Sequence, residues 1–166
     1  MPTYIVTSDG IATANGTKTM LQITAGADKG FTLRRWHVSG NASSADYTRY
    51  RIIRQTNTGT VGSAATEGTH YHIAPNNSSD GSQTETFTVV GGPATGTWSA
   101  EPTTATINGS NAQLDTWCVA NNGGIFDSTG YAREDGGIKV PAGGRLALVA
   151  VGTSNTYTPS IVLVID

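Results

Sequence analysis

The sequence predicts an all-β fold: a two-sheet antiparallel β-sandwich, jelly-roll-like, with long polar loops and little or no helix. Apolar and polar residues alternate with a period of two through most of the chain, as in strands with one buried face. Clusters of Gly, Pro, Asn and Ser separate the alternating segments. No segment of about ten or more residues shows a clean 3.6-residue period, so any helix is limited to a turn or two. Sandwiches with many short strands are commonly closed as jelly rolls or related Greek keys.

The first half of the chain contains three clear strand signals and two weaker ones. In the first clear segment, Leu21 and Ile23 alternate with Gln22 and Thr24. The next two clear segments are longer and follow the same pattern. The clear segments are Lys18–Ala25, Gly30–Ser39 and Tyr47–Arg54, and the weaker ones are Thr3–Thr7 and Thr69–Ile73.

The second half of the chain contains four further strand signals: Thr84–Val90, Gln113–Ala120, Arg145–Val151 and Ser160–Ile165. The last of them is an uninterrupted apolar run, which suits a strand covered on both faces, by its own sandwich or by another subunit. We therefore expect Ile161, Leu163 and Ile165 to lie in the core or to supply the apolar part of an interface.

Length and composition predict a single domain over residues 1–166, because the sequence contains no repeat and no linker. Charged residues make up only 13% of the chain and the net charge is −2, which argues against nucleic acid and anionic membranes as partners. The start of the sequence lacks the features of a secretion signal, and no stretch is long and apolar enough to span a membrane. We expect a protein made in the cytoplasm.

The search for a metal or catalytic site finds weak candidates only. His70 and His72 would share a strand face, and His37 lies on another strand, but two histidines without a carboxylate or thiolate are a poor ligand set. We expect no metal, no cofactor and no catalytic residues. The carboxylates that a glycosidase would need are scattered, and nothing selects two of them as partners. They are Glu101, Asp115, Asp127, Glu134 and Asp135.

Aromatic residues and the single cysteine favour structural roles. Trp36, Trp98 and Trp117 could form a sugar platform, but burial in the core is the more frequent outcome in a sandwich. Cys118 lies between Trp117 and Val119, and these apolar neighbours predict a buried, inert thiol.

Arginine is distributed unevenly along the chain. Five of the seven arginines fall in two consecutive strand segments: Arg34, Arg35, Arg49, Arg51 and Arg54. If these segments pair or stack, they concentrate guanidinium groups on one part of the molecule. Solvated residues with local ion pairs are one interpretation. The other is a protein–protein contact, because arginine binds carboxylates in interfaces better than lysine does.

The order of these pieces resembles that of small head decoration (cement) proteins and related virion proteins of tailed bacteriophages. The resemblance begins with the Thr-rich N-terminal strand and extends through Leu21–Gly40, Tyr47–Thr56, Trp98–Thr103, Asn121–Ile125 and Gly136–Gly152. It implies a jelly-roll-like sandwich, a homotrimer, the major capsid protein as partner and a place on the outer surface of the capsid. It also implies that the protein is not an enzyme.

Two other functions remain open at this point. A receptor- or glycan-binding module of a tail fibre or tail tip would use the same sandwich with loop aromatics, such as Tyr71, Trp98 and Tyr131. An enzyme of the cupin or lyase kind would need a histidine and carboxylate ligand set, which we could not assemble from this sequence.

Overall fold

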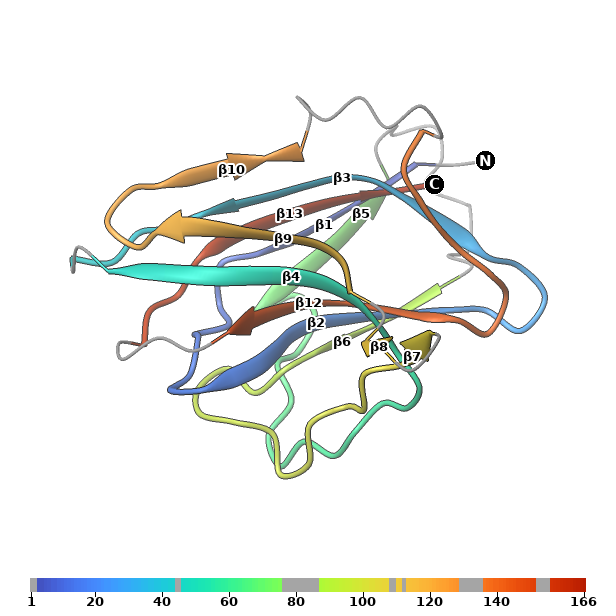
Figure 1. Cartoon of the computed structure of the whole chain (residues 1–166), viewed down its shortest axis with the longest axis horizontal. Helices are drawn as coiled ribbons and strands as arrows, with labels where there is room; N and C mark the ends of the chain where they lie inside the picture. The colour runs from blue at the N-terminus through green and yellow to red at the C-terminus, as the bar shows by residue number, and fades with distance from the viewer. Residues whose placement is uncertain are drawn as a thin grey trace.

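Two antiparallel sheets lie face to face in the computed structural model (Figure 1). It describes residues 3–43, 46–75, 87–107, 110–111, 113–128, 136–151 and 156–166. Every regular element in these ranges is a strand. The predicted all-β, two-sheet antiparallel sandwich is therefore confirmed.

Sheet I contains both ends of the described chain. Its order is β10 (Ile125–Asp127), β3 (Phe31–Ser39), β13 (Ser160–Ile165), β1 (Tyr4–Ser8) and β5 (Tyr71–Pro75), and β11 (Ile138–Val140) also pairs with β3. Sheet II has the order β6 (Phe87–Gly91), β2 (Thr17–Ala25), β12 (Arg145–Val151), β4 (Tyr47–Gln55) and β9 (Gln113–Ala120). A separate two-stranded pair consists of β7 (Thr106–Ile107) and β8 (Ser110–Asn111).

The strand pairs are nested along the chain. The first strand pairs with the last, β2 with β12, β3 with β10 and β11, and β4 with β9. In addition, β13 lies beside β3 and β12 beside β4. The strand predicted at Ser160–Ile165 is thus β13, and it lies inside sheet I between β3 and β1.

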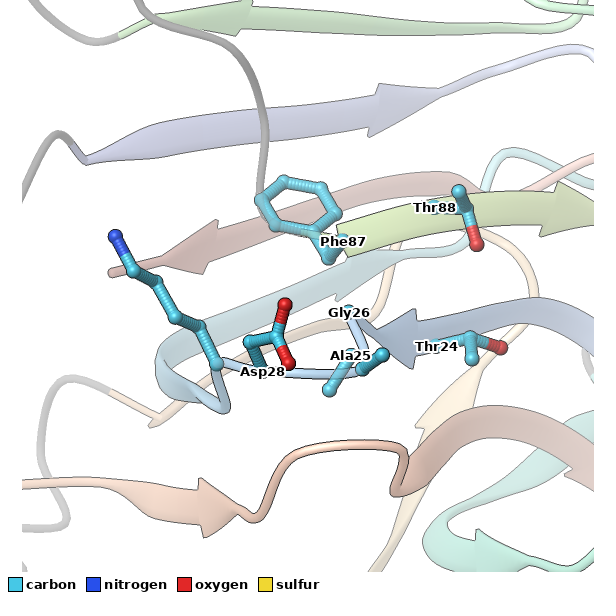
Figure 2. A pocket seen from close by; sticks show the side chains of 8 residues that line it. Thr24, Ala25, Gly26, Asp28, Phe87 and Thr88 are labelled. Carbon is cyan, nitrogen blue, oxygen red and sulfur yellow. The ribbon is translucent and has the colours of Figure 1, made fainter.

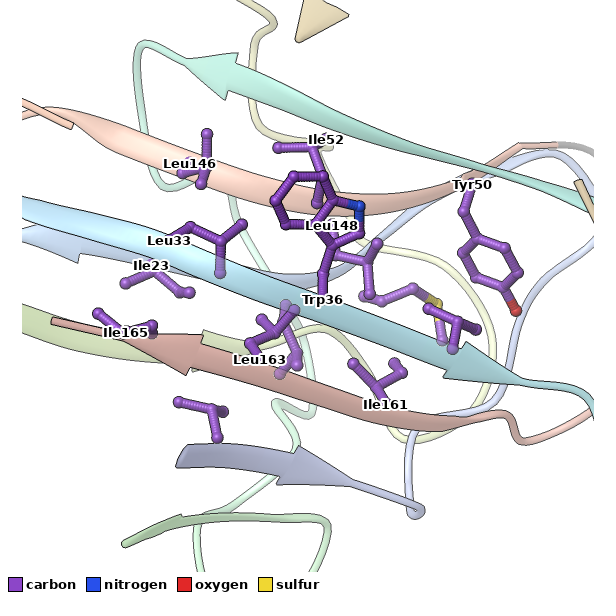
Figure 3. Packing of buried hydrophobic residues seen from close by; sticks show 14 of the residues in the cluster. Ile23, Leu33, Trp36, Tyr50, Ile52, Leu146, Leu148, Ile161, Leu163 and Ile165 are labelled. Atoms are coloured by element: carbon purple, nitrogen blue, oxygen red, sulfur yellow. The ribbon is translucent and has the colours of Figure 1, made fainter. Parts of the chain in front are cut away.

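The core fills the space between the two inner faces (Figure 3). Ile161, Leu163 and Ile165 of β13 point into it and are at most 1% exposed. The prediction that these residues lie in the core is confirmed. The alternative prediction, that they form the apolar part of an interface, is wrong, because the opposite sheet already covers their side chains. Val162 and Val164, between them on β13, are half-buried on the outer face.

Short strands are the main departure from the predicted elements. The sequence does not predict β7, β8, β10 or β11, because two or three residues are too few to display an alternating pattern. The predicted segment Thr84–Val90 corresponds to β6, and its first three residues lie outside the described part of the chain.

Two loops cover part of the outer face of sheet II. Residues 56–70 and 92–105 run together beside β2 and β6 (Figure 1), and Thr60 and Ala100 exchange backbone hydrogen bonds. Beneath the loops, the buried Gln22 donates to Gln55 Oε1 at 2.6 Å and to the backbone oxygen of Asn57 at 2.8 Å. Trp98 Nε1 donates to the backbone oxygen of Thr19 at 2.8 Å. These side-chain bonds tie the loops to the sheet.

A buried lysine secures the same region. Lys18 is fully buried, and its Nζ donates to the backbone oxygens of Ala12 and Pro93 at 2.6 Å each. Desolvation lowers the pKa of Lys18 to about 8, while the charge of Glu101 partly opposes that shift. In the unfolded chain the same amine keeps its proton up to about pH 10.5. Burial of the charged amine lowers the free energy of unfolding, and this loss disappears as the pH rises and the amine gives up its proton.

We predict that the free energy of unfolding rises by about 2 kcal/mol between pH 7 and pH 9.5 because of Lys18, since the unfolded state binds more protons in this range. Chemical denaturation at a series of pH values measures the rise. The Lys18→Met variant should lack this increment whatever its absolute stability. An identical pH dependence in the two proteins would contradict the lowered pKa.

Candidate functional site

The five arginines do not form the single cluster that the sequence suggests. Arg34 and Arg35 lie on β3 in sheet I, whereas Arg49, Arg51 and Arg54 lie on β4 in sheet II. The two strands belong to different sheets, so their outward side chains point away from each other. The prediction of one concentrated patch is therefore wrong, and the arginines must be assessed separately.

Three of these arginines have partners within the molecule. Arg34 forms an ion pair with Asp166 and donates from Nη1 to the backbone oxygen of Gly136 at 2.6 Å. Arg35 binds Asp127 through two nitrogens, of which Nε lies 3.0 Å from Oδ1. Arg54 Nη2 donates to the backbone oxygen of Lys139 in sheet I at 2.8 Å. These contacts compensate the charges of Arg34 and Arg35 and tie Arg54 to the opposite sheet.

Arg49 and Arg51 have no acidic partner among the described residues. Both point outward from β4, and two residues along a strand separate their Cα atoms by about 7 Å. The Nε atom of Arg51 is buried and makes no hydrogen bond with any described residue. Two adjacent uncompensated guanidinium groups make this surface a candidate site for an anionic partner.

An apolar strip runs beside these two arginines. In the register of β12 and β4, Val151 lies opposite Arg49 and Val149 lies opposite Arg51. Val149 forms a small cluster on this side of the sheet with Ile53 and Ala147, but all three are buried; Val151, which packs against them, is half-buried and reaches the surface. We call the surface formed by Tyr47, Arg49, Arg51, Thr116, Cys118 and Val151 the arginine face. It combines positive charge with apolar area, as many protein-binding surfaces do.

Cys118 belongs to this face and is exposed, so the predicted buried thiol is wrong. Trp117 and Val119 are buried, and side chains alternate along a strand. Because Trp117 and Val119 point into the core, Cys118 between them points to solvent. It lies opposite Arg49 in the register of β4 and β9.

The histidines are not placed to share a metal ion. Asp127, His37, Val162, Thr7 and His72 form one row across the outer face of sheet I. Three strand spacings, about 14 Å, separate the two histidines of this row. The third, His70, lies in the turn before β5, where its Nδ1 accepts the backbone N–H of Thr66 at 3.1 Å. The described residues contain no group of three or more His, Cys, Asp or Glu that could hold an ion.

The candidate carboxylates do not converge within the described part of the chain. Glu101 accepts the backbone N–H of Thr19 at 3.0 Å, and Asp115 accepts that of Thr116 at 2.8 Å. Asp127 is held by Arg35. Glu134 and Asp135 lie outside the described residues.

The described aromatics among those suggested for a glycan surface are buried. Trp98 is bonded to Thr19 beneath the loops, and Tyr71 donates its hydroxyl to the backbone oxygen of Val89 at 3.1 Å. Trp36 and Trp117 belong to the core. Tyr131 lies outside the described residues. Of the aromatics considered for sugar stacking, none of the described ones is available on the surface.

A cleft of about 320 Å³ lies where β2 ends and β6 begins. Figure 2 shows the ring of Phe87 and the carboxylate of Asp28 beside it, with Thr24 and Thr88 nearby. The charged lining residues, Asp28 and Lys29, are exposed neighbours of opposite sign. None of the described residues that line this cleft is a buried polar residue that would select a ligand, so the arginine face is the stronger candidate.

Comparisons with protein-family models, curated proteins and solved structures found no match to this chain. The resemblance to phage decoration proteins therefore stays a prediction. No helix in the described residues is long and apolar enough to cross a membrane.

We predict that Cys118 reacts with a thiol reagent in the native protein, taking up one label per chain without denaturant, because the side chain is exposed. Mass spectrometry of the intact protein counts the labels. The Cys118→Ser variant is the control and should take up none. Labelling of the wild type only after addition of denaturant would contradict the outward orientation of Cys118.

Proposed function

We propose that this protein is a virion structural protein of a tailed bacteriophage, a decoration (cement) protein that binds the outer surface of the head. The resemblance of its sequence to that group supports the proposal. The observation that carries it is the arginine face, where Arg49 and Arg51 have no acidic partner among the described residues. In this proposal the major capsid protein supplies the carboxylates at the junctions between capsomers.

The sandwich supplies a rigid support for this contact. Both arginines are on β4, which lies between β12 and β9 in sheet II, so backbone hydrogen bonds on both sides fix their directions. The sheet fixes where these side chains leave the backbone, but each guanidinium group still loses rotamer freedom on binding, which costs about 0.5–1.5 kcal/mol for each arginine. The exposed ring of Tyr47 and the half-buried Val151 beside the arginines would exclude water from the new ion pairs.

Stabilisation of a head in this way is mechanical and needs no catalytic step. Each copy adds contact area across a junction that the pressure of packaged DNA tends to open. The free energy gained at one site is modest, but it is repeated over a closed shell and strengthened wherever an oligomer makes several contacts at once.

We also infer that the sandwich is wound as a jelly roll. A jelly roll arises when a long antiparallel ribbon of nested strand pairs is rolled into two sheets. The nested pairs of this chain, from β1 with β13 to β4 with β9, follow that scheme. In this view, β5 and β6 are additions at the edges of the two sheets.

We predict that the Arg49→Glu/Arg51→Glu variant loses affinity for undecorated heads by more than about a hundredfold, because two attractive contacts become repulsive. Co-sedimentation of the folded variants with purified heads measures the binding. The Arg34→Glu/Arg35→Glu variant changes the net charge equally on the opposite sheet and should bind like the wild type. Unchanged binding of the first variant, or equal loss in both, would contradict the assignment.

A further inference from the structure

The arginine face ends at an open edge of sheet II. The last strand of this sheet is β9, which pairs with β4 alone among the described strands (Figure 1). An edge strand presents a row of backbone N–H and C=O groups that can pair with another chain. Two residues of the arginine face, Thr116 and Cys118, lie on this strand. A partner of the face can therefore bind to backbone groups as well as to side chains.

The backbone groups of Thr116 and Cys118 point toward this open edge. The N–H of Thr116 donates to Oδ1 of Asp115 at 2.8 Å, so it is not directed at β4. In an antiparallel pair, residues that exchange hydrogen bonds alternate with residues that do not. Thr116 lies opposite Arg51, and Cys118 lies opposite Arg49. Both pairs are therefore of the kind without hydrogen bonds, in which the N–H and C=O groups point away from the neighbouring strand.

The turn between β9 and β10 closes one end of this edge. Ala120 lies opposite Tyr47, and its carbonyl oxygen accepts the backbone N–H of Gly124 at 2.8 Å. This bond follows the same alternation, because it also points away from β4. No backbone group of the described residues outside β4 bonds to Thr116 or Cys118. The open part of the edge therefore consists of residues 116–119.

The side chains next to the edge favour an acidic partner. Thr116 and Cys118 are small, and neither Arg49 nor Arg51 behind them has an acidic partner in the described part of the chain. A strand added to β9 would lie two strand spacings, about 10 Å, from β4. Long side chains on one face of a sheet reach beyond their direct neighbours. A glutamate on the added strand and an arginine on β4 can therefore meet above the small side chains.

Asp115 sets the opposite requirement for the other side of the edge. It lies opposite Ile52, whose side chain is buried in the core, so Asp115 belongs to the inner side of β9. An acidic residue beside it on an added strand would be repelled. Successive residues of a strand point to opposite faces. The segment that fits this edge therefore has acidic residues at every second position, with neutral residues between them.

We propose that the arginine face binds an extended segment in which acidic and neutral residues alternate, and that this segment pairs with β9 as a sixth strand of sheet II. On pairing, a carbonyl group of the segment replaces Asp115 Oδ1 as the acceptor of the Thr116 N–H. The inference rests on the proposed function for the identity of the partner, the major capsid protein. It adds the conformation and the sequence pattern that the face recognises.

Two end-blocked peptides of identical composition test the pattern. In the alternating peptide, glutamates alternate with threonines and valines, whereas in the contiguous peptide the glutamates follow one another. Each is titrated into the isotope-labelled full chain and followed by NMR. The alternating peptide should shift the amide signals of Thr116 and Cys118 saturably and bind at least tenfold more tightly than the contiguous one. Equal affinities would overturn the proposal, because charge alone would then explain binding, and so would a failure of the alternating peptide to bind.

Loss of backbone pairing is tested on both partners. The Cys118→Pro variant removes one N–H from the open edge, where an edge strand tolerates proline, and should bind the alternating peptide at least tenfold more weakly. The contiguous peptide is the control, because its charge-driven binding should be the same in both proteins. An alternating peptide that is N-methylated along its length should not bind the wild type, and this measurement does not depend on the folding of a variant. Undiminished binding of the N-methylated peptide would overturn the proposal.

Co-sedimentation with undecorated heads separates this inference from the proposed function. A folded Cys118→Pro variant that binds heads as well as the wild type does, while Arg49→Glu/Arg51→Glu does not, would overturn the strand pairing and leave the proposed function standing. If the wild type binds the alternating peptide selectively but does not bind heads, the strand pairing is supported and the proposed function is contradicted.

Discussion

The pairing register of the two central strands, β12 and β13, determines which surface each side chain occupies. Each of these strands lies between two partners, and a slip of one residue would exchange its buried and outward residues. The register is interrupted once along each of these strands, against β2 and against β3, and once more between β4 and β9; at each place one strand carries an extra residue that bulges from the sheet. The extra residues are Met20, Arg34 and Leu114. The core and both outer faces depend on this arrangement.

The bulge in β3 shows how a backbone irregularity shapes a surface. Strict alternation from Leu33 would turn Arg35 into the core and Trp36 to the outer face. With one extra residue, Leu33 and Trp36 both point into the core while Arg34 and Arg35 are both about half exposed. The two adjacent arginines can then bind separate carboxylates. The inner face of sheet I is therefore closed and the arginines on its outer face are neutralised, whereas the outward arginines of sheet II have no acidic partner among the residues that the structure describes.

Alternation of residue types is sufficient to predict the fold class, the long strands and the membership of Leu163 in the core. It does not reveal which strands share a sheet, because that depends on contacts between residues far apart in the chain. For this reason the arginines of β3 and β4 looked like one cluster. The orientation of Cys118, by contrast, could have been predicted, since its neighbours Trp117 and Val119 are clear inward positions in a strand. The role of Lys18 depends on loop carbonyls that no local pattern indicates.

We propose that this chain acts as a repeated, non-catalytic component of a virus head. Its copy number in purified particles, measured by quantitative mass spectrometry against the major capsid protein, tests that claim most directly. A lattice-bound protein should be present in hundreds of copies, in a simple ratio to the capsid subunit. A handful of copies per particle would place it in the tail or a fibre, and its absence from particles would contradict a structural role in the virion.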